Sequence, residues 1–98
     1  MIYVFLCEDK PGGLQLRLDT RPAHIAYLTQ LNEAGTLKFA GPFLGDDGKP
    51  IGSLVAVEAA DLAAAKSLVA NDPYAQAGLF ATVEIQPWSW TFNNPSAA

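Results

Sequence analysis

The stretch TLKFAGPFLGDDGKPIGSLVAVEA, residues 36–59, decides the fold of this chain. It contains two runs rich in β-branched and aromatic residues, 36–43 and 51–59, with the short segment LGDDGKP between them. Runs of this composition are typical of strands, and the Asp47-Gly48 pair in the connection is a strong turn signal. The stretch therefore predicts two antiparallel strands joined as a hairpin, with a loop longer than two residues.

Gly41 and Pro42 interrupt the first of these two strands. Glycine contributes no side chain to a sheet and proline has no amide hydrogen to donate, so both are disfavoured inside a central strand. They predict an edge strand, a bulge, or a place where another group approaches the backbone closely.

The segment that precedes the hairpin predicts a helix. Thr20 or Arg21 serves as its cap, and Pro22 occupies the first turn, where its missing amide hydrogen costs nothing. The helix is expected to end at about Ala34, before Gly35. The residues before it, EDKPGGLQLRLDT, contain Pro-Gly-Gly and then charges between leucines, so we expect a loop with at most one turn of helix there.

The segment that follows the hairpin predicts a second helix. Asp61 is a good N-cap, with its carboxylate near the positive end of the helix dipole. The helix must end before Pro73, because Asp72 precedes a proline and is pushed out of the α region. The residues PYAQA then give one further turn, which Gly78 closes.

Strands are also predicted at the two ends of this pattern, over residues 2–8 and 79–88. The first is a short, continuous apolar run, and the second alternates between apolar and polar residues. Alternation places Leu79, Ala81, Val83 and Ile85 on one face of the second strand and Phe80, Thr82 and Glu84 on the other.

The resulting order is β, α, β, β, α, β, the ferredoxin-like arrangement of the α+β class. It has a four-stranded antiparallel sheet with two helices on one face and no cover on the other. Both alternating sets of positions in 2–8 and 51–59 are hydrophobic, and such a patch is seldom left open to water in a monomer. We therefore expect a homodimer that forms through the sheet face. The pattern is that of one domain, residues 1–92, and we expect residues 93–98 to form a flexible tail.

Composition excludes several classes of partner. The 98 residues carry 6 Lys and Arg against 10 Asp and Glu, a net charge of −4, which is not the basic footprint that phosphate backbones require. No apolar stretch approaches the roughly eighteen residues needed to cross a bilayer. The single cysteine, Cys7, cannot form an internal disulfide, and the chain opens in a strand-like run instead of a secretory signal. We expect a cytoplasmic protein that binds neither nucleic acid nor membrane.

The only histidine, His24, lies at a helical position that faces the sheet together with Tyr27, Leu28 and Leu31. A histidine among apolar residues is often a core residue that donates to a backbone carbonyl. Histidine is also the side-chain type whose unperturbed pKa, about 6.5, lies near neutral pH, and it is the natural general acid or base. Both interpretations are open on the sequence of the helix alone.

Asp72 also has two interpretations. It is a good N-cap for the short turn that follows it, and it lies at the C-terminal end of the second helix, which should pack beside the first. A carboxylate close to His24 would fix the tautomer of the imidazole and raise its basicity. Capping and orienting do not exclude each other.

Further residues are candidates for the walls of a pocket around this pair. Arg21 lies one helical turn before His24, and Arg21 and Arg17 would hold a carboxylate or an enolate. The ordinary interpretation of every such residue is structural, for example an arginine in solvent. The strand side of the cavity would consist of Gly41, Pro42 and Ser53, with Tyr74 as a wall or a hydroxyl donor.

Three motifs, in this order and spacing, resemble the YCII-related (YciI-like) proteins. They are R-x-x-H at 21–24, A-G-P at 40–42, and D-P-Y followed by A-G within 72–78. The resemblance extends from residue 1 to about residue 90. It implies a ferredoxin-like unit that dimerises into an α/β barrel, with an active site made of a His and an Asp, which are His24 and Asp72 in this chain.

The leading hypothesis is an enzyme of small molecules in which His24 moves a proton and Asp72 orients it. Lyase, isomerase or dehydrohalogenase-type chemistry on an acidic or cyclic compound fits such a pair. We expect no metal, because one histidine and one distant cysteine are too few ligands, and no nucleotide cofactor, because the glycine-rich phosphate-binding motifs are missing. Two alternatives stay open: a protein that binds a small ligand without converting it, and an interaction protein whose sheet face docks other chains.

Overall fold

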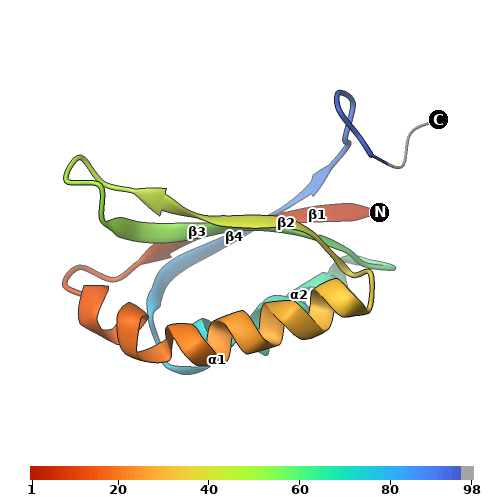
Figure 1. Ribbon diagram of the computed structural model, residues 1–98. Coiled ribbons are helices and arrows are strands. Elements are labelled where there is room, and N and C mark those ends of the chain that lie inside the picture. Colours follow the sequence, from red (N-terminus) through yellow and green to blue (C-terminus); the bar gives the residue numbers. More distant parts are fainter. Residues whose placement is uncertain (96–98) are drawn as a thin grey trace.

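The chain folds into a four-stranded antiparallel sheet with its helices on one face, as the computed structural model shows for residues 1–95 (Figure 1). The strand order is β2-β3-β1-β4, so the first and third strands along the chain are central. This is the ferredoxin-like α+β fold that the sequence predicts. The elements are β1 (Ile2–Asp9), α1 (Leu14–Glu33), β2 (Leu37–Leu44), β3 (Pro50–Glu58), α2 (Leu62–Ala70), α3 (Pro73–Gln76) and β4 (Phe80–Trp88).

Helix α1 begins much earlier than predicted, at Leu14, so the expected loop over the residues before Thr20 is wrong. Its N-cap is Gly13, which has no side chain for capping, and Pro22 lies inside the helix instead of in its first turn. The buried residues of α1 are Arg17, His24 and Leu28, of which two are polar. A buried face with so few apolar residues does not give the hydrophobic periodicity by which a helix is found in a sequence.

Strand β2 is an edge strand, which is one of the three possibilities that Gly41 and Pro42 leave open. Pro42 lies opposite Ser53 of β3, and the register of the pair shifts near both ends of β2. An edge strand has a neighbouring strand on one side only. Such a position tolerates Pro42, which has no amide hydrogen to donate to a second neighbour.

Strand β4 contains an irregularity that reverses the predicted orientation of Phe80. Along β1, Glu8 lies opposite Thr82 but Asp9 lies opposite Phe80, so β4 has one extra residue at this point. On the far side of an extra residue, side chains again alternate between the two faces of the sheet, but each position now points to the face opposite to the one expected. Phe80 therefore packs against the core on the helix side, together with Ile85, and its predicted place beside Thr82 and Glu84 is wrong.

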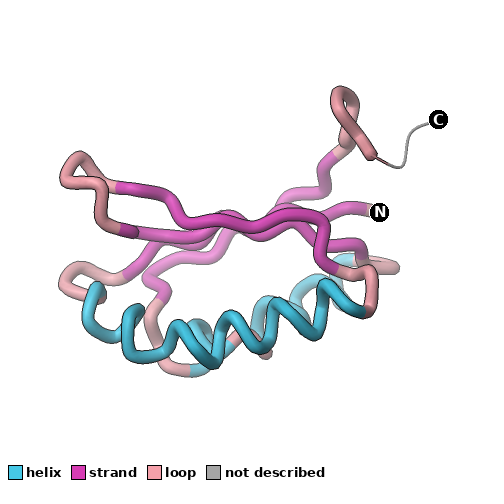
Figure 2. The backbone as a smooth tube through the Cα atoms, in the orientation of Figure 1, coloured by secondary structure: helices cyan, strands magenta, loops and turns pink. Residues whose placement is uncertain are grey.

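Figure 2 shows the sheet and the helices as two layers seen from the side, and the core side chains lie between these layers. Every second residue of the central strands β1 and β3 points into the core. Residues that lie opposite each other on the two strands point to the same face, so they enter the core together. Helix α2 and the second half of α1 cover them. The buried members from the sheet are Tyr3, Phe5, Cys7, Val55 and Val57.

Cys7 gives a prediction about chemical reactivity. Burial, with a smaller contribution from the negative charge of Asp72, raises the pKa of the Cys7 thiol to about 12. The reactive species is the thiolate, so at pH 8 only about one thiol in ten thousand is reactive in the folded state. A thiolate-directed reagent should modify the protein at pH 8 quickly in denaturant and very slowly without it; fast labelling of the native protein would contradict the buried position.

The same shift predicts how stability varies at alkaline pH. The unfolded chain loses the Cys7 proton near its ordinary pKa while the folded chain keeps it, so the native state binds more protons and the free energy of unfolding falls as pH rises from about 9 toward 12. Urea denaturation of wild type and Cys7→Ala across this range measures the effect. Between about pH 9 and pH 12, the free energy of unfolding should fall less for Cys7→Ala than for wild type.

Three aromatic rings partly cover the other face of the sheet. The ring centroid of Phe39, on β2, is 5.4 Å from that of Trp88 on β4 and 5.1 Å from that of Trp90. The rings thus reach across the two central strands, where Val4 and Ala56 are buried although no helix lies over them. At the end of this face that includes Phe43, the Phe43 side chain is exposed.

Other expectations from the sequence concern the tail and the surroundings of the protein. The predicted flexible tail, 93–98, lies partly outside the described residues, and the domain boundary at 92 stays a prediction. No helix within residues 1–95 is long and apolar enough to cross a membrane. The cytoplasmic location also stays a prediction.

Candidate active site

A cavity of about 330 Å³ lies between α1 and the edge of the sheet formed by β2 and β3. Its walls are mostly apolar, with Leu18, Ile25 and Leu28 on the helix side. Asp72 does not line the cavity; it lies behind His24. The other site residues suggested by the sequence all line it: Arg17, Arg21, His24, Gly41, Pro42, Ser53 and Tyr74.

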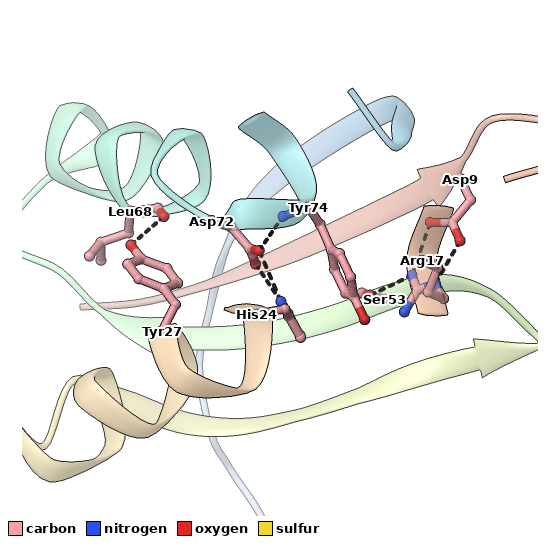
Figure 3. Close-up of polar contacts among 8 residues, drawn as sticks. All are labelled: Asp9, Arg17, His24, Tyr27, Ser53, Leu68, Asp72 and Tyr74. Carbon is pink, nitrogen blue, oxygen red and sulfur yellow. Dashed lines mark hydrogen bonds and ion pairs between the residues drawn. The ribbon is translucent and has the colours of Figure 1, made fainter. Parts of the chain in front are cut away.

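His24 and Asp72 are in direct contact although they lie far apart in the sequence. The Nδ1 atom of His24 is 2.9 Å from Oδ1 and 3.0 Å from Oδ2 of Asp72, and both residues are buried. The helices are held side by side at this point, because the hydroxyl of Tyr27 on α1 donates to the carbonyl of Leu68 on α2 at 2.7 Å (Figure 3). His24 is in the middle of α1 and not near its start, since the helix begins at Leu14.

This contact determines the state of the imidazole. A carboxylate only accepts hydrogen bonds, so in neutral His24 the hydrogen is on Nδ1 and the lone pair is on Nε2. Because His24 lines the cavity and Asp72 holds Nδ1, Nε2 is the ring nitrogen available to a bound molecule. The arrangement can accept a proton from such a molecule and return it.

Asp72 also caps the short helix α3. Its Oδ1 accepts from the amide of Tyr74 at 2.9 Å, and the same oxygen accepts from Nδ1 of His24. The two interpretations that the sequence leaves open for Asp72 therefore describe one carboxylate with two donors.

Arg17 is buried and its charge is paired. Its Nε donates to Oδ2 of Asp9 at 2.7 Å, and its Nη2 donates to Oδ1 of Asp9 at 2.9 Å and to Oγ of Ser53 at 2.8 Å. Burial opposes the charged form, but the ion pair with Asp9 outweighs it and keeps the pKa of Arg17 above its ordinary value. The guanidinium thus has less capacity to bind a ligand anion than a free arginine has.

Arg21 differs from Arg17 in this respect. It is exposed, it lines the cavity, and within residues 1–95 no hydrogen bond or ion pair engages its guanidinium. Its charge is therefore the available positive charge at the mouth of the cavity.

Tyr74 separates the two buried basic groups. Its ring is stacked on the imidazole of His24, with 3.9 Å between ring centroids and 16° between ring planes, and Cζ of Arg17 is 4.7 Å from the centroid of the same ring. Figure 3 shows His24 on one side of Tyr74 and Arg17 on the other. Burial raises the pKa of the Tyr74 hydroxyl, against the lowering effect of Arg17 and Arg21.

Asp9 belongs to this group and was not among the residues predicted from the sequence. It is the last residue of β1 and holds Arg17 in place. The one signal in the sequence is the spacing of eight between the aspartate and the arginine, and it predicts no contact if the intervening residues form a loop. Only the early start of α1 brings Arg17 over the end of β1.

Known proteins resemble this chain over most of its length. Protein YciI of Escherichia coli O6:H1 is 37% identical over 98 residues, which cover 94% of this chain and 100% of that protein. The "Derivative of benzaldehyde biosynthesis cluster protein C" of Emericella nidulans is 38% identical over 86 residues, covering 79% of this chain and 88% of the relative.

Solved structures show the same similarity. The 5-chloro-2-hydroxyhydroquinone dehydrochlorinase TftG of Burkholderia phenoliruptrix AC1100, in complex with 2,5-dihydroxybenzoquinone, has a TM-score of 0.85 and 36% identity, covering 96% of this chain and 99% of that one. A NIPSNAP family protein of Agrobacterium tumefaciens has a TM-score of 0.56 and 22% identity, covering 98% of this chain and 97% of that one. At this level of identity the similarity shows a common fold and nothing further. The model of the YCII-related domain matches residues 1–89. The chain belongs to the YCII-related family.

Proposed function

We propose that the cavity is the active site of a cofactor-independent enzyme that transfers a proton on a small acidic or cyclic compound. The observation that carries the proposal is the hydrogen bond from Nδ1 of His24 to Asp72, which leaves Nε2 as a proton acceptor at a cavity wall. In this proposal His24 is the general base and Asp72 orients it and stabilises the imidazolium that forms.

The size and the lining of the cavity support a small cyclic substrate. A volume of about 330 Å³ lies at the lower end of the range for ligand sites. The apolar walls suit a planar ring, while the free charge of Arg21 suits one acidic oxygen on that ring. A dehydrochlorinase among the similar structures is a precedent for the chemistry, and its ligand is a compound of this kind.

The proposed step is an elimination that needs no oxidant or reductant. Nε2 of His24 takes a proton from an O–H or C–H group of the substrate, and the bonding electrons form a new π bond. The leaving group, which is chloride in a dehydrochlorination, departs with the electron pair of its bond to carbon, so the net change is the loss of HCl. Arg21 is then placed to stabilise the negative charge that develops on the substrate oxygen.

Binding of the compound found in the similar structure is the first test. We expect 2,5-dihydroxybenzoquinone to raise the melting temperature of the wild-type protein, because a ligand that binds only the native state stabilises it by mass action. Arg21→Gln should weaken this effect by removing the unpaired charge, and Lys66→Gln, a charge removed from α2 away from the cavity, should not. No shift with wild type at millimolar ligand would contradict a site for this class of compound.

Turnover separates an enzyme from a binding protein. Wild-type protein mixed with 5-chloro-2-hydroxyhydroquinone should release chloride, which an ion-selective electrode detects. Binding of 2,5-dihydroxybenzoquinone without release of chloride from the chlorinated compound would favour the alternative, a protein that holds a small ligand without converting it.

We also propose that two copies of the chain associate through the sheet face that carries no helix. The support is the exposure of large apolar side chains there, with Phe43 42% and Trp88 39% exposed. Burying a Phe side chain contributes ~2 kcal/mol, and each protomer contributes the same patch to the interface. An aspartate in place of Phe43 should therefore weaken the association of the two protomers strongly.

Light scattering coupled to size-exclusion chromatography tests this association. Wild type should elute with twice the mass of the chain, and Phe43→Asp should shift toward the monomer. Leu62→Asp is the matched control, because Leu62 is equally exposed, at 44%, but lies on α2. A monomeric wild type would contradict the proposal.

A further inference from the structure

Five buried side chains, contributed by the end of β1, by α1 and by the start of α3, form one continuous row, whose course can be followed in Figure 3. The row runs from Asp9 to Arg17, from Arg17 to the ring of Tyr74, from Tyr74 to His24, and from His24 to Asp72. The proposed chemistry uses only the last two members. The first three raise the question of what they contribute.

The contact with Asp72 does not by itself fix the imidazole. Both oxygens of Asp72 are within 3.0 Å of the same nitrogen, Nδ1, so the carboxylate holds one edge of the ring. A ring held at one edge can still tilt about that edge, and the tilt moves Nε2, which is on the opposite side of the ring. A proton acceptor that moves in this way loses the alignment that its reaction requires.

Tyr74 blocks this tilt. Its ring lies nearly parallel to the imidazole at a centroid distance of 3.9 Å, which is contact distance, and the Tyr74 side chain is 1% exposed. Tyr74 is itself held at both ends: its amide donates to Asp72, and the guanidinium of Arg17 lies against its ring. Arg17 is in turn held by Asp9 and Ser53.

We propose that Tyr74 is a positioning residue for His24, and that the Arg17–Asp9 ion pair keeps Tyr74 in place as the outer support. The ring plane of Tyr74 sets the direction of Nε2 into the cavity, because the ring and not the hydroxyl group is stacked on the imidazole. The inference rests on the proposed function, in which His24 moves the proton, but its test observes the imidazole directly and requires no substrate.

The composition of the chain makes the test direct, because His24 is the only histidine and its imidazole signals need no assignment by mutation. In wild type, nuclear Overhauser contacts should join the ring protons of Tyr74 to those of His24, and the imidazole C–H vectors should have high order parameters. Absence of these contacts in the wild-type protein would overturn the proposal.

Two variants separate the ring from the hydroxyl group. Tyr74→Phe keeps the flat ring and should leave the order parameters of the imidazole unchanged. Tyr74→Leu removes the ring and should lower them, while the hydrogen on Nδ1 persists because Asp72 is still present. Tyr74→Met, which is closer to tyrosine in length, replaces Tyr74→Leu if the latter does not fold.

Unchanged imidazole order in a folded Leu or Met variant would overturn the proposal, because Asp72 alone would then hold the ring. This outcome differs from a failure of the proposed function. If only the proposed function fails, the ring contacts and the order parameters are still as described, but no compound that binds in the cavity is converted.

Discussion

Replacement of His24 by asparagine should lower turnover of the cavity's substrate by ~10²- to 10⁴-fold, which is the usual contribution of a general acid or base. Asparagine tests the base specifically, because its amide N–H can still donate to Asp72 from about the position of Nδ1. It has no atom with a basic lone pair at the position of Nε2. The variant therefore removes proton transfer and keeps the polar contact that connects α1 to the start of α3.

Chloride release from 5-chloro-2-hydroxyhydroquinone, or the corresponding assay for whichever ring compound binds, measures this effect. Binding of 2,5-dihydroxybenzoquinone should change by much less than turnover, because the walls of the cavity are unaltered. The melting temperature serves as a control for folding. Equal turnover by wild type and His24→Asn would refute the role of His24 as the base.

Replacement of Asp9 by leucine should have the largest effect on stability, a loss of ~3–5 kcal/mol in the free energy of unfolding. The side chains of Asp9 and Arg17 are 6% and 5% exposed, so the substitution leaves a buried guanidinium without its counter-charge. A domain of this size has ~5–15 kcal/mol of stability in total, so the variant should unfold at a much lower urea concentration.

The matched control is the pair of substitutions together. Asp9→Leu with Arg17→Met removes both charges and fills the site with apolar side chains of similar length, which should recover most of the loss. Urea denaturation of wild type, the two single variants and the double variant gives the coupling energy directly. A double variant as unstable as the sum of the two single variants would show that the pair contributes through shape and not through charge.

The order of the elements could be predicted from the sequence because its signals are local. The hairpin turn at Asp47-Gly48, the cap at Asp61 and the proline after Asp72 each act within a few residues, and each lies where the structure has a boundary. Four strands and two helical regions in this order then leave few arrangements of the chain.

Features that depend on contacts between distant residues could not be predicted in this way. The first turns of α1 were missed because Arg17 faces inward, and an inward arginine is interpretable only once its partner Asp9 is known. The reversed orientation of Phe80 depends on one extra residue in the pairing with β1, which no periodicity in β4 reports.

The residues of the candidate site were suggested by a mixture of both kinds of signal. His24 and Asp72 are each open to a structural interpretation on the sequence alone, and the resemblance to the YCII-related proteins suggests that they form a site; packing on one sheet brings them to 2.9 Å. The stacking of Tyr74 between His24 and Arg17 has no counterpart in the sequence, because it depends on side-chain directions from three elements.

The shared use of one oxygen of Asp72 constrains how the family can vary in evolution. Asp61 caps α2 through the amide of Ala64 and, among residues 1–95, its side chain makes no other hydrogen bond or ion pair, so substitution by serine, threonine or asparagine there should cost little stability. At position 72 the same substitutions would keep the turn and remove the negative charge beside the imidazole. In the proposed function, selection for folding and selection for chemistry therefore act on the same carboxylate. Relatives that have lost the proposed reaction should then be recognisable by the loss of this aspartate while the proline after it persists.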